Sequence, residues 1–244
     1  MKTLKGSLLI VFLLFVSSSP APAYELATHG RLTYEAFLRS VLIPNPDDPN
    51  DPQLLKTLGI ENGVSPFGTT YYDISGTEVR ERERQLFEQE KGRMPRGTEA
   101  LSVEGWLMRG ALREDDLGQL FGINVGGDPH DDPYGNIFRV FNHFYDPIFD
   151  RPLTVVTAEK APNWALGSTD AFANPIQPNT SRRNHFTVFD AREAMYRALT
   201  GKKKDGTDAG PNNQPATEAH RKAYWATLFR ALGDVVHLVQ DMGQ

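Results

Sequence analysis

The segment that begins near Thr217 constrains the fold more than any other part of the chain. Its apolar side chains recur at helical spacing, which predicts one long helix. They are Leu228, Leu232, Val235, Val236 and Val239. His237 and Asp241 lie four residues apart in the same segment. A rotation of about 100° per residue brings two such side chains to one side of a helix, one turn apart. We therefore expect an imidazole and a carboxylate within reach of one cation.

Three other segments show the helical period. The first predicted helix begins at His29 and ends before the proline-rich stretch 43–52; its apolar residues are Leu32, Ala36, Phe37 and Val41. The second covers 102–116, and its expected core residues are Trp106, Leu107 and Leu112. The third covers 189–201, where Gly201 can end the helix in a left-handed conformation.

The remaining segments are less regular. The charged segment 76–91 has few apolar residues and predicts a solvated surface helix. Residues 134–146 fit a short helix, with an apolar side formed by Ile137, Val140, Phe141 and Phe144. The polar stretch 202–216 is typical of a flexible connector. We find no internal repeat and no strong strand alternation. The expected class is all-α, a single multi-helix domain with long loops.

Residues 1–23 are typical of a secretory signal peptide. Two lysines precede an apolar run from Leu8 to Val16, and small residues follow at 21–23. The apolar run is too short to span a bilayer. The alternative is an uncleaved anchor or a buried helix, which does not account for the order of charge, apolar core and small residues. We expect cleavage before Tyr24, a mature domain at 24–244, and a secreted or periplasmic protein without a transmembrane segment.

Charge and cysteine content restrict the chemistry. Cleavage would leave 221 of the 244 residues, with 24 basic and 31 acidic side chains and a net charge of −7. This balance argues against broad electrostatic capture of nucleic acid or anionic membrane, although a local basic groove is still open. The chain has no cysteine. A metal would therefore be held by histidine nitrogen and carboxylate oxygen. We expect a monomer.

Two more histidines have candidate partners. His29 lies five residues after Tyr24, whose free amino group and carbonyl could chelate a metal. His143 is flanked by aromatic residues and follows the adjacent carboxylates Asp115 and Asp116. Two interpretations of His143 stay open, a metal ligand and a member of an aromatic core stripe. We expect the other histidines to be structural or solvated, and these are His130, His185 and His220.

Four short blocks in this order resemble the zinc-dependent phospholipase C and single-strand nuclease superfamily. They are His29 after a cleaved terminus, GALREDD at 110–116, NHFYDP at 142–147 and HLVQDMGQ at 237–244. The resemblance spans most of the mature chain but is confined to these blocks. It implies an all-α fold built around a zinc cluster, and hydrolysis of phosphate esters by metal-activated water.

The resemblance also implies which residues bind zinc. The amino terminus and carbonyl of Tyr24 would bind one zinc together with His29 and Asp241. The family usually has tryptophan at the first position, so Tyr24 is a departure, although backbone ligation does not need the indole. A second zinc would be bound by Asp115, His143, His237 and Asp241, so that Asp241 bridges the two. Asp115, preferred to Asp116, is also the expected catalytic residue, because it could orient the attacking water.

The family's third zinc uses ligands that would follow Gln244, so ligands for two of up to three zinc ions are present. We expect the natural protein to continue beyond this residue.

Three functions are compatible with these observations. The leading expectation is an exported phospholipase C-like hydrolase of phospholipid or another phosphodiester, because the HFYDP block resembles that branch. The spacing from Tyr24 to His29 resembles the single-strand nuclease branch, for which nucleic acid would be the substrate. The third is a non-catalytic metal-binding helical module or inactive fragment, which the missing downstream ligands favour.

Overall fold

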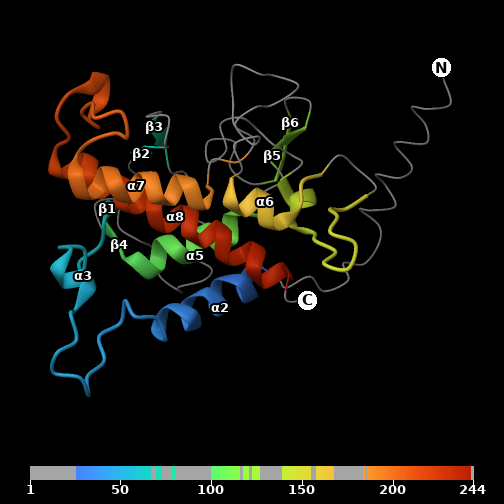
Figure 1. Ribbon diagram of the computed structural model, residues 1–244, viewed down its shortest axis with the longest axis horizontal. Helices are drawn as coiled ribbons and strands as arrows, with labels where there is room; N and C mark the ends of the chain where they lie inside the picture. Colours follow the sequence, from blue (N-terminus) through green and yellow to red (C-terminus); the bar gives the residue numbers. More distant parts are fainter. Residues whose placement is uncertain are drawn as a thin grey trace.

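The computed structural model describes residues 26–66, 70–72, 78–80, 100–115, 118–120, 123–126, 139–154, 158–167, 184 and 186–242. The predicted signal peptide and Tyr24 lie outside these ranges. The described part is predominantly helical, which confirms the all-α class (Figure 1). None of its helices is long and apolar enough to cross a membrane.

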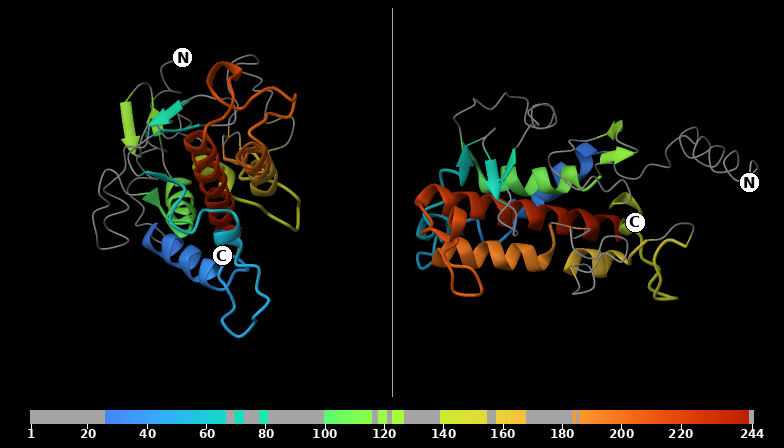
Figure 2. Two further views of the ribbon diagram at one scale, coloured as in Figure 1. Left: turned by 90° about the vertical axis from the view of Figure 1, so that its left-hand side faces the viewer. Right: turned by 90° about the horizontal axis from the view of Figure 1, so that it is seen from above.

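Helix α8 (Glu218–Met242) is the axis of the fold. Helices α5 (Val103–Arg113) and α7 (Val188–Thr200) pack along it, and α2 (Leu26–Leu38) packs against α5 and α8. Figures 1 and 2 show α8 between α5 and α7, with α2 on the outer side of α5. Helix α8 confirms the long helix predicted from about Thr217. At its start, Thr217 Oγ1 accepts a hydrogen bond from the backbone N–H of His220.

The predicted helices at 102–116 and 189–201 are also confirmed. Trp106, Leu107 and Leu112 of α5 are buried as expected. Ser102 caps the start of α5, because its side chain accepts from the third N–H of the helix. Helix α7 ends at Gly201, whose φ of 69° is left-handed, as the sequence predicts.

Helices α5 and α8 cross at two glycines. A Cβ atom added to Gly110 would overlap the backbone of Arg230, Gly233 and Asp234. One added to Gly233 would overlap the carbonyl of Leu107. Only residues without a side chain permit this approach of two backbones. The crossing holds the carboxyl end of α5 next to the last two turns of α8.

The first helix differs from the prediction. It begins at Leu26, so His29 lies inside its first turn instead of opening it. Its buried side carries His29, Thr33 and Phe37, whereas Leu32 and Val41, expected on the apolar face, are exposed. Polar side chains are buried here because this face of the helix meets the ligand-type residues of α8.

The segment 134–146 was also expected to form a helix with an apolar side. The described portion is a short 3-10 helix, η1 (Arg139–His143), and residues 134–138 lie outside the description. Arg139, Asn142 and His143 are buried, while Phe144 is exposed. Of the predicted apolar face, Val140 and Phe141 are half-buried, Phe144 is exposed and Ile137 lies outside the description, so the most buried side of η1 is polar. This excludes the interpretation of His143 and Phe144 as members of one aromatic core stripe.

Strands occur only as three short antiparallel pairs within the described residues. These are β1 (Ser65–Pro66) with β4 (Ala100–Leu101), β2 (Thr70–Tyr72) with β3 (Glu78–Arg80), and β5 (Gly118–Leu120) with β6 (Ile123–Gly126). Strand β3 corrects the surface helix predicted at 76–91. Residues 78–80 are extended because they pair with a strand rich in tyrosine and threonine, which favour sheets. Residues 81–91 lie outside the description.

The remaining elements are short connections. Helices α3 (Leu54–Thr57) and α6 (Ala161–Leu166) and the 3-10 helix η3 (Pro211–Asn213) complete the described part.

The stretch 202–216, predicted as a flexible connector, is a hydrogen-bonded loop. Lys202 Nζ donates to Asp208, and the Tyr224 hydroxyl of α8 donates to the carbonyl of Ala209 over 2.7 Å. These bonds fold the loop back onto α8.

Candidate metal centre

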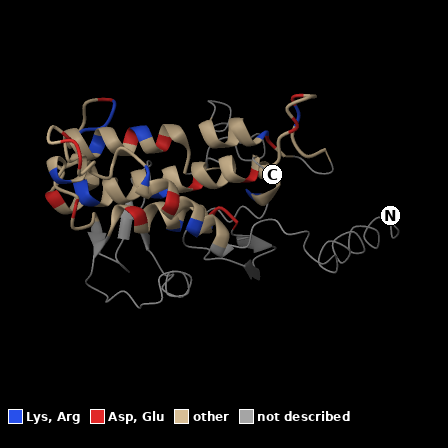
Figure 3. Ribbon diagram, turned by 90° about the horizontal axis from the view of Figure 1, so that it is seen from below, with Lys and Arg blue, Asp and Glu red and all other residues tan. Residues whose placement is uncertain are grey.

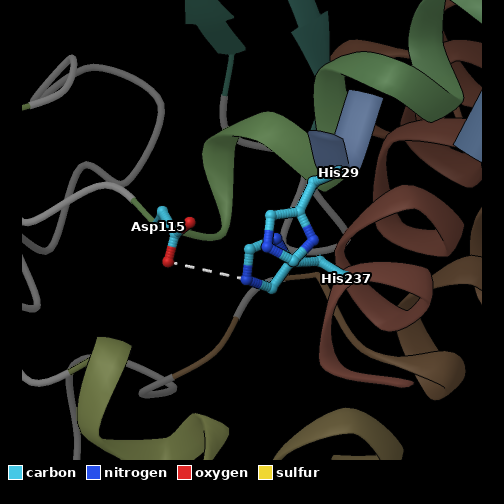
Figure 4. A group of neighbouring side chains, drawn as sticks. All are labelled: His29, Asp115 and His237. Atoms are coloured by element: carbon cyan, nitrogen blue, oxygen red, sulfur yellow. Dashed lines mark ion pairs between the residues drawn. The ribbon is translucent and has the colours of Figure 1, made fainter. Parts of the chain in front are cut away.

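Five of the six predicted metal ligands meet at one end of the bundle. Helix α2 contributes His29, the turn after α5 contributes Asp115, η1 contributes His143, and α8 contributes His237 and Asp241. The sixth, Tyr24, lies outside the described residues. Figure 4 shows the imidazoles of His29 and His237 side by side, with Asp115 facing His237. Four stretches that are distant in the sequence thus converge.

Asp241 is the carboxylate that all three imidazoles approach. Its Oδ2 lies 2.8 Å from Nδ1 of His143 and 3.1 Å from Nε2 of His237. Its Oδ1 lies 3.4 Å from Nε2 of His29. Asp241 thus has ligand-type nitrogens near both of its oxygens.

Asp115 is the second carboxylate of the cluster. Its Oδ1 lies 3.5 Å from Nε2 of His237 and 3.7 Å from Nδ1 of His143. Two overlapping groups could each hold a metal ion, since each offers one ligand atom per residue within 4.8 Å of the others. One group is His29, Asp115 and His237, and the other is His143, His237 and Asp241. The neighbouring Asp116 lies outside the described residues.

The hydrogen bonds behind two of the imidazoles determine which nitrogen faces the cluster. The Ala111 carbonyl can only accept, so Nδ1 of His237 donates to it over 2.6 Å. Gln240 donates its amide to Thr33 over 3.1 Å, which leaves its Oε1 to accept from Nδ1 of His29 over 2.7 Å. Both rings therefore present Nε2 to the carboxylates, and this is the nitrogen that a metal ion would bind in place of a proton. Such outer hydrogen bonds are the usual support of metal-binding histidines.

Burial divides the cluster into an inner and an outer part. The side chains of His29, His143 and His237 are buried. Those of Asp241 and Asp115 are 17% and 33% exposed. The rings of His29 and His237 stack with centroids 3.9 Å apart, and the ring of His143 meets His237 edge-on at 4.8 Å. The imidazoles are thus shielded from water while the carboxylates face the solvent.

The electrostatics of the cluster favour a cation. Burial lowers the pKa of His29, and the nearby His237 lowers it further. For His237 burial acts in the same direction, but the hydrogen bonds to Asp115 and Asp241 outweigh it and raise the pKa to about 10. Burial would raise the pKa of Asp241, but bonds from His143 and His237 hold it below its usual range. A metal ion can replace the imidazole protons that these carboxylates attract.

The donor set suits a metal ion. Imidazole nitrogen and carboxylate oxygen are common metal ligands, and the residues offer no thiolate. The outer hydrogen bonds of His29 and His237 occupy Nδ1, so Nε2 of each ring is the nitrogen that can bind a metal ion between the imidazoles and the carboxylates.

Sequence reasoning missed the residues that support the ligands. Gln240 and Glu114 each directly precede a predicted ligand in the sequence, and adjacency was the only signal that could have found them. Of the histidines expected to be structural, His220 accepts a hydrogen bond from the backbone N–H of Thr217 at the start of α8. His130 and His185 lie outside the described residues.

No protein-family model, curated protein or solved structure matches this chain.

Proposed function

We propose that this protein is an exported zinc-dependent hydrolase of phosphate esters, related to phospholipase C and the single-strand nucleases. The convergence of His29, His143 and His237 on Asp241 supports this function. These residues come from the sequence blocks on which the family resemblance rests. The chain would bind zinc through them, through Asp115 and through the amino terminus at Tyr24.

The residues around the cluster would divide the work of hydrolysis. When bound, zinc lowers the pKa of water toward neutrality and offsets negative charge on phosphoryl oxygens during in-line attack. Asp115 has the most exposed side chain of the cluster and would orient the attacking water as well as bind metal. The buried imidazoles hold the inner side of the site and exclude bulk water from it.

The loop after η1 favours a lipid substrate. Phe144, Ile148 and Phe149 are exposed in the residues directly after His143. Asp146 holds the turn by accepting from the N–H groups of Ile148 and Phe149 over 3.0 and 3.3 Å. An apolar projection beside the site suits the interface of a lipid aggregate.

The charges near this loop also favour a lipid over a nucleic-acid strand, because the basic side chains are paired with acidic ones. Arg151 pairs with Asp146 at 3.0 Å, and Lys160 pairs with Asp150 at 2.7 Å. Figure 3 shows acidic and basic residues interspersed along the described helices. A channel for a single strand combines aromatic platforms with a positively charged groove.

One observation favours the second candidate, a single-strand nuclease. The Arg151 guanidinium lies over the Phe149 ring, 4.7 Å from its centroid, which places a basic group beside an exposed aromatic ring.

The test is a comparison of two substrates. The full-length natural protein, loaded with zinc, is assayed on phosphatidylcholine vesicles for release of phosphocholine and on single-stranded DNA for release of nucleotides. We expect phosphocholine release that a chelator abolishes. Cleavage of DNA alone would favour the nuclease branch. Tight zinc binding without hydrolysis of either substrate would favour a non-catalytic metal-binding module.

A further inference from the structure

We infer that Glu114 is a positioning residue of the metal centre, whose carboxylate orients the His143 ring so that Nδ1 is the metal-binding nitrogen. This inference rests on the proposed metal site but not on its hydrolytic activity. Glu114 directly follows α5 and precedes Asp115, and its side chain is buried. Two consecutive carboxylates thus take different places, Glu114 behind the ligands and Asp115 among them.

The two nitrogens of the His143 ring face different carboxylates. Nε2 lies 3.6 Å from Oε1 of Glu114. Nδ1 of the same ring lies 2.8 Å from Asp241 and 3.7 Å from Asp115. A neutral imidazole carries one proton and offers one lone pair. Without a metal, Nδ1 donates its proton to Asp241, because a carboxylate can only accept. A metal ion would take the place of that proton, and the ring would then keep its proton on Nε2, toward Glu114.

His143 therefore differs from the other two histidines. His29 and His237 donate through Nδ1 to Gln240 and to the Ala111 carbonyl, and they present Nε2 to the cluster. Their outer partners are neutral, whereas the outer partner of His143 is a carboxylate. A carboxylate behind a metal-bound imidazole fixes its orientation and raises its basicity.

The Glu114 carboxylate is itself held from two sides. Trp164 of α6 donates its indole N–H to Oε1 over 2.8 Å. Nε of Arg139 lies 3.5 Å from Oε2. A buried carboxylate held by a hydrogen bond and an ion pair in this way provides a rigid support for the His143 ring.

A comparison within the molecule separates this role from a purely structural one. Glu193 and Arg197 of α7 also form a buried pair, with 2.9 Å between Arg197 Nε and Oε1. That pair lies outside both metal-binding groups. The Glu114–Arg139 pair has in addition the imidazole contact. Substitution of Glu193 is therefore a matched control for the loss of charge in a buried Glu–Arg pair.

The experiment compares zinc binding by the full-length protein and two variants. Glu114→Gln keeps the size of the side chain and an oxygen that can accept from Trp164, but removes the charge. Zinc affinity is measured by competition with a chromophoric chelator. We expect Glu114→Gln to weaken zinc binding by about 10- to 100-fold. Glu193→Gln should lower the thermal stability of the metal-free protein and leave zinc affinity unchanged.

A second measurement uses the unsubstituted protein and does not depend on whether a variant folds. Long-range ¹H–¹⁵N correlation spectra of the zinc-loaded protein identify the protonated nitrogen of each histidine. We expect His143 to be protonated at Nε2, and His29 and His237 at Nδ1.

Four results separate this inference from the proposed function. Protonation of zinc-bound His143 at Nδ1, or equal zinc affinity of Glu114→Gln and the unsubstituted protein, would overturn the role of Glu114. Absence of zinc binding by the unsubstituted protein would overturn the metal centre and this role with it. Zinc binding with the expected protonation but without hydrolysis would contradict only the proposed function.

Discussion

The ring of His29 stacks on that of His237, with centroids 3.9 Å apart and an angle of 23° between the planes. The two residues belong to α2 and α8, and each donates through Nδ1 to its own partner outside the cluster. Their Nε2 atoms consequently face the same two carboxylates. His237 belongs to both candidate groups, but it offers one nitrogen to the cluster and so can bind one ion at a time. Under the proposed function two ions would therefore share Asp241, whose two oxygens approach all three imidazoles.

The first prediction concerns the number of metal ions lost. Asp241→Asn should loosen two zinc ions, because Asp241 lies within 3.4 Å of ligand nitrogens on His29, His143 and His237. His29→Ala should loosen one. Atomic emission on the purified full-length protein, expressed per mole of protein, gives the counts.

A surface carboxylate provides the control for this count. Asp208 pairs with Lys202 at 2.6 Å outside the cluster, so Asp208→Asn should retain all the zinc of the unsubstituted protein. Equal losses from Asp241→Asn and His29→Ala would contradict the bridging role of Asp241.

The second prediction concerns the crossing of α5 and α8. Gly110→Ala should lower the free energy of unfolding by about 3 kcal/mol or more, because the added methyl group meets backbone atoms that cannot move aside separately. Gly59→Ala is the control, since nothing lies within 4 Å of its added Cβ and only its φ of 69° is unfavourable. We expect a loss of about 1 kcal/mol there. Denaturant unfolding measures both, and similar losses would contradict the close crossing.

The helices could be predicted from the sequence, whereas the crossing of α5 and α8 could not. Helices α5, α7 and α8 follow from apolar periodicity, and the pairing of His237 with Asp241 follows from spacing along one helix. These are local relationships that a helical repeat determines. The approach of Gly110 to Gly233 depends on two helices distant in the sequence, and neither glycine stands out in its own segment.

The errors have a common physical cause. Leu32 of α2 and Phe144 directly after η1 were predicted to be buried but are exposed, while His29 and His143 are buried. Periodicity assumes that the apolar side of a helix faces the core. At this site the core side is polar, because the imidazoles are satisfied by carboxylates from other elements. The sequence blocks behind the family resemblance, and not periodicity, singled out His29 and His143, which the structure brings next to Asp241.

The third prediction concerns the amino terminus. If Tyr24 binds zinc through its amino group, a mature protein with one additional methionine before Tyr24 should lose one zinc ion, since an amide nitrogen replaces the free amine. Mass spectrometry of the exported protein should first show a chain that starts at Tyr24. Atomic emission then compares the two forms. Full zinc content in the extended form would exclude the amino terminus as a ligand.

The fourth prediction concerns the exposed loop after η1. Ile148 is 83% exposed, and Val41, which follows α2, is 81% exposed. Ile148→Asp should reduce turnover on phosphatidylcholine vesicles by about tenfold, which corresponds to the loss of one buried aliphatic side chain at the lipid surface. Turnover of a water-soluble phosphodiester should not change. Val41→Asp should leave both activities intact, and a matching loss in that variant would show that the loop has no particular role at the interface.

The last prediction concerns the contribution of metal to stability. The cluster joins α2, the end of α5, η1 and α8, so zinc binding should hold these elements together in the native state. A ligand at 1,000 times its dissociation constant adds about 4 kcal/mol to the free energy of unfolding. Chelation should therefore lower the midpoint of thermal unfolding, and restored zinc should raise it again. The double variant His237→Ala/Asp241→Asn should show no response to zinc or chelator; the same shift in that variant would place the stabilising ion elsewhere in the protein.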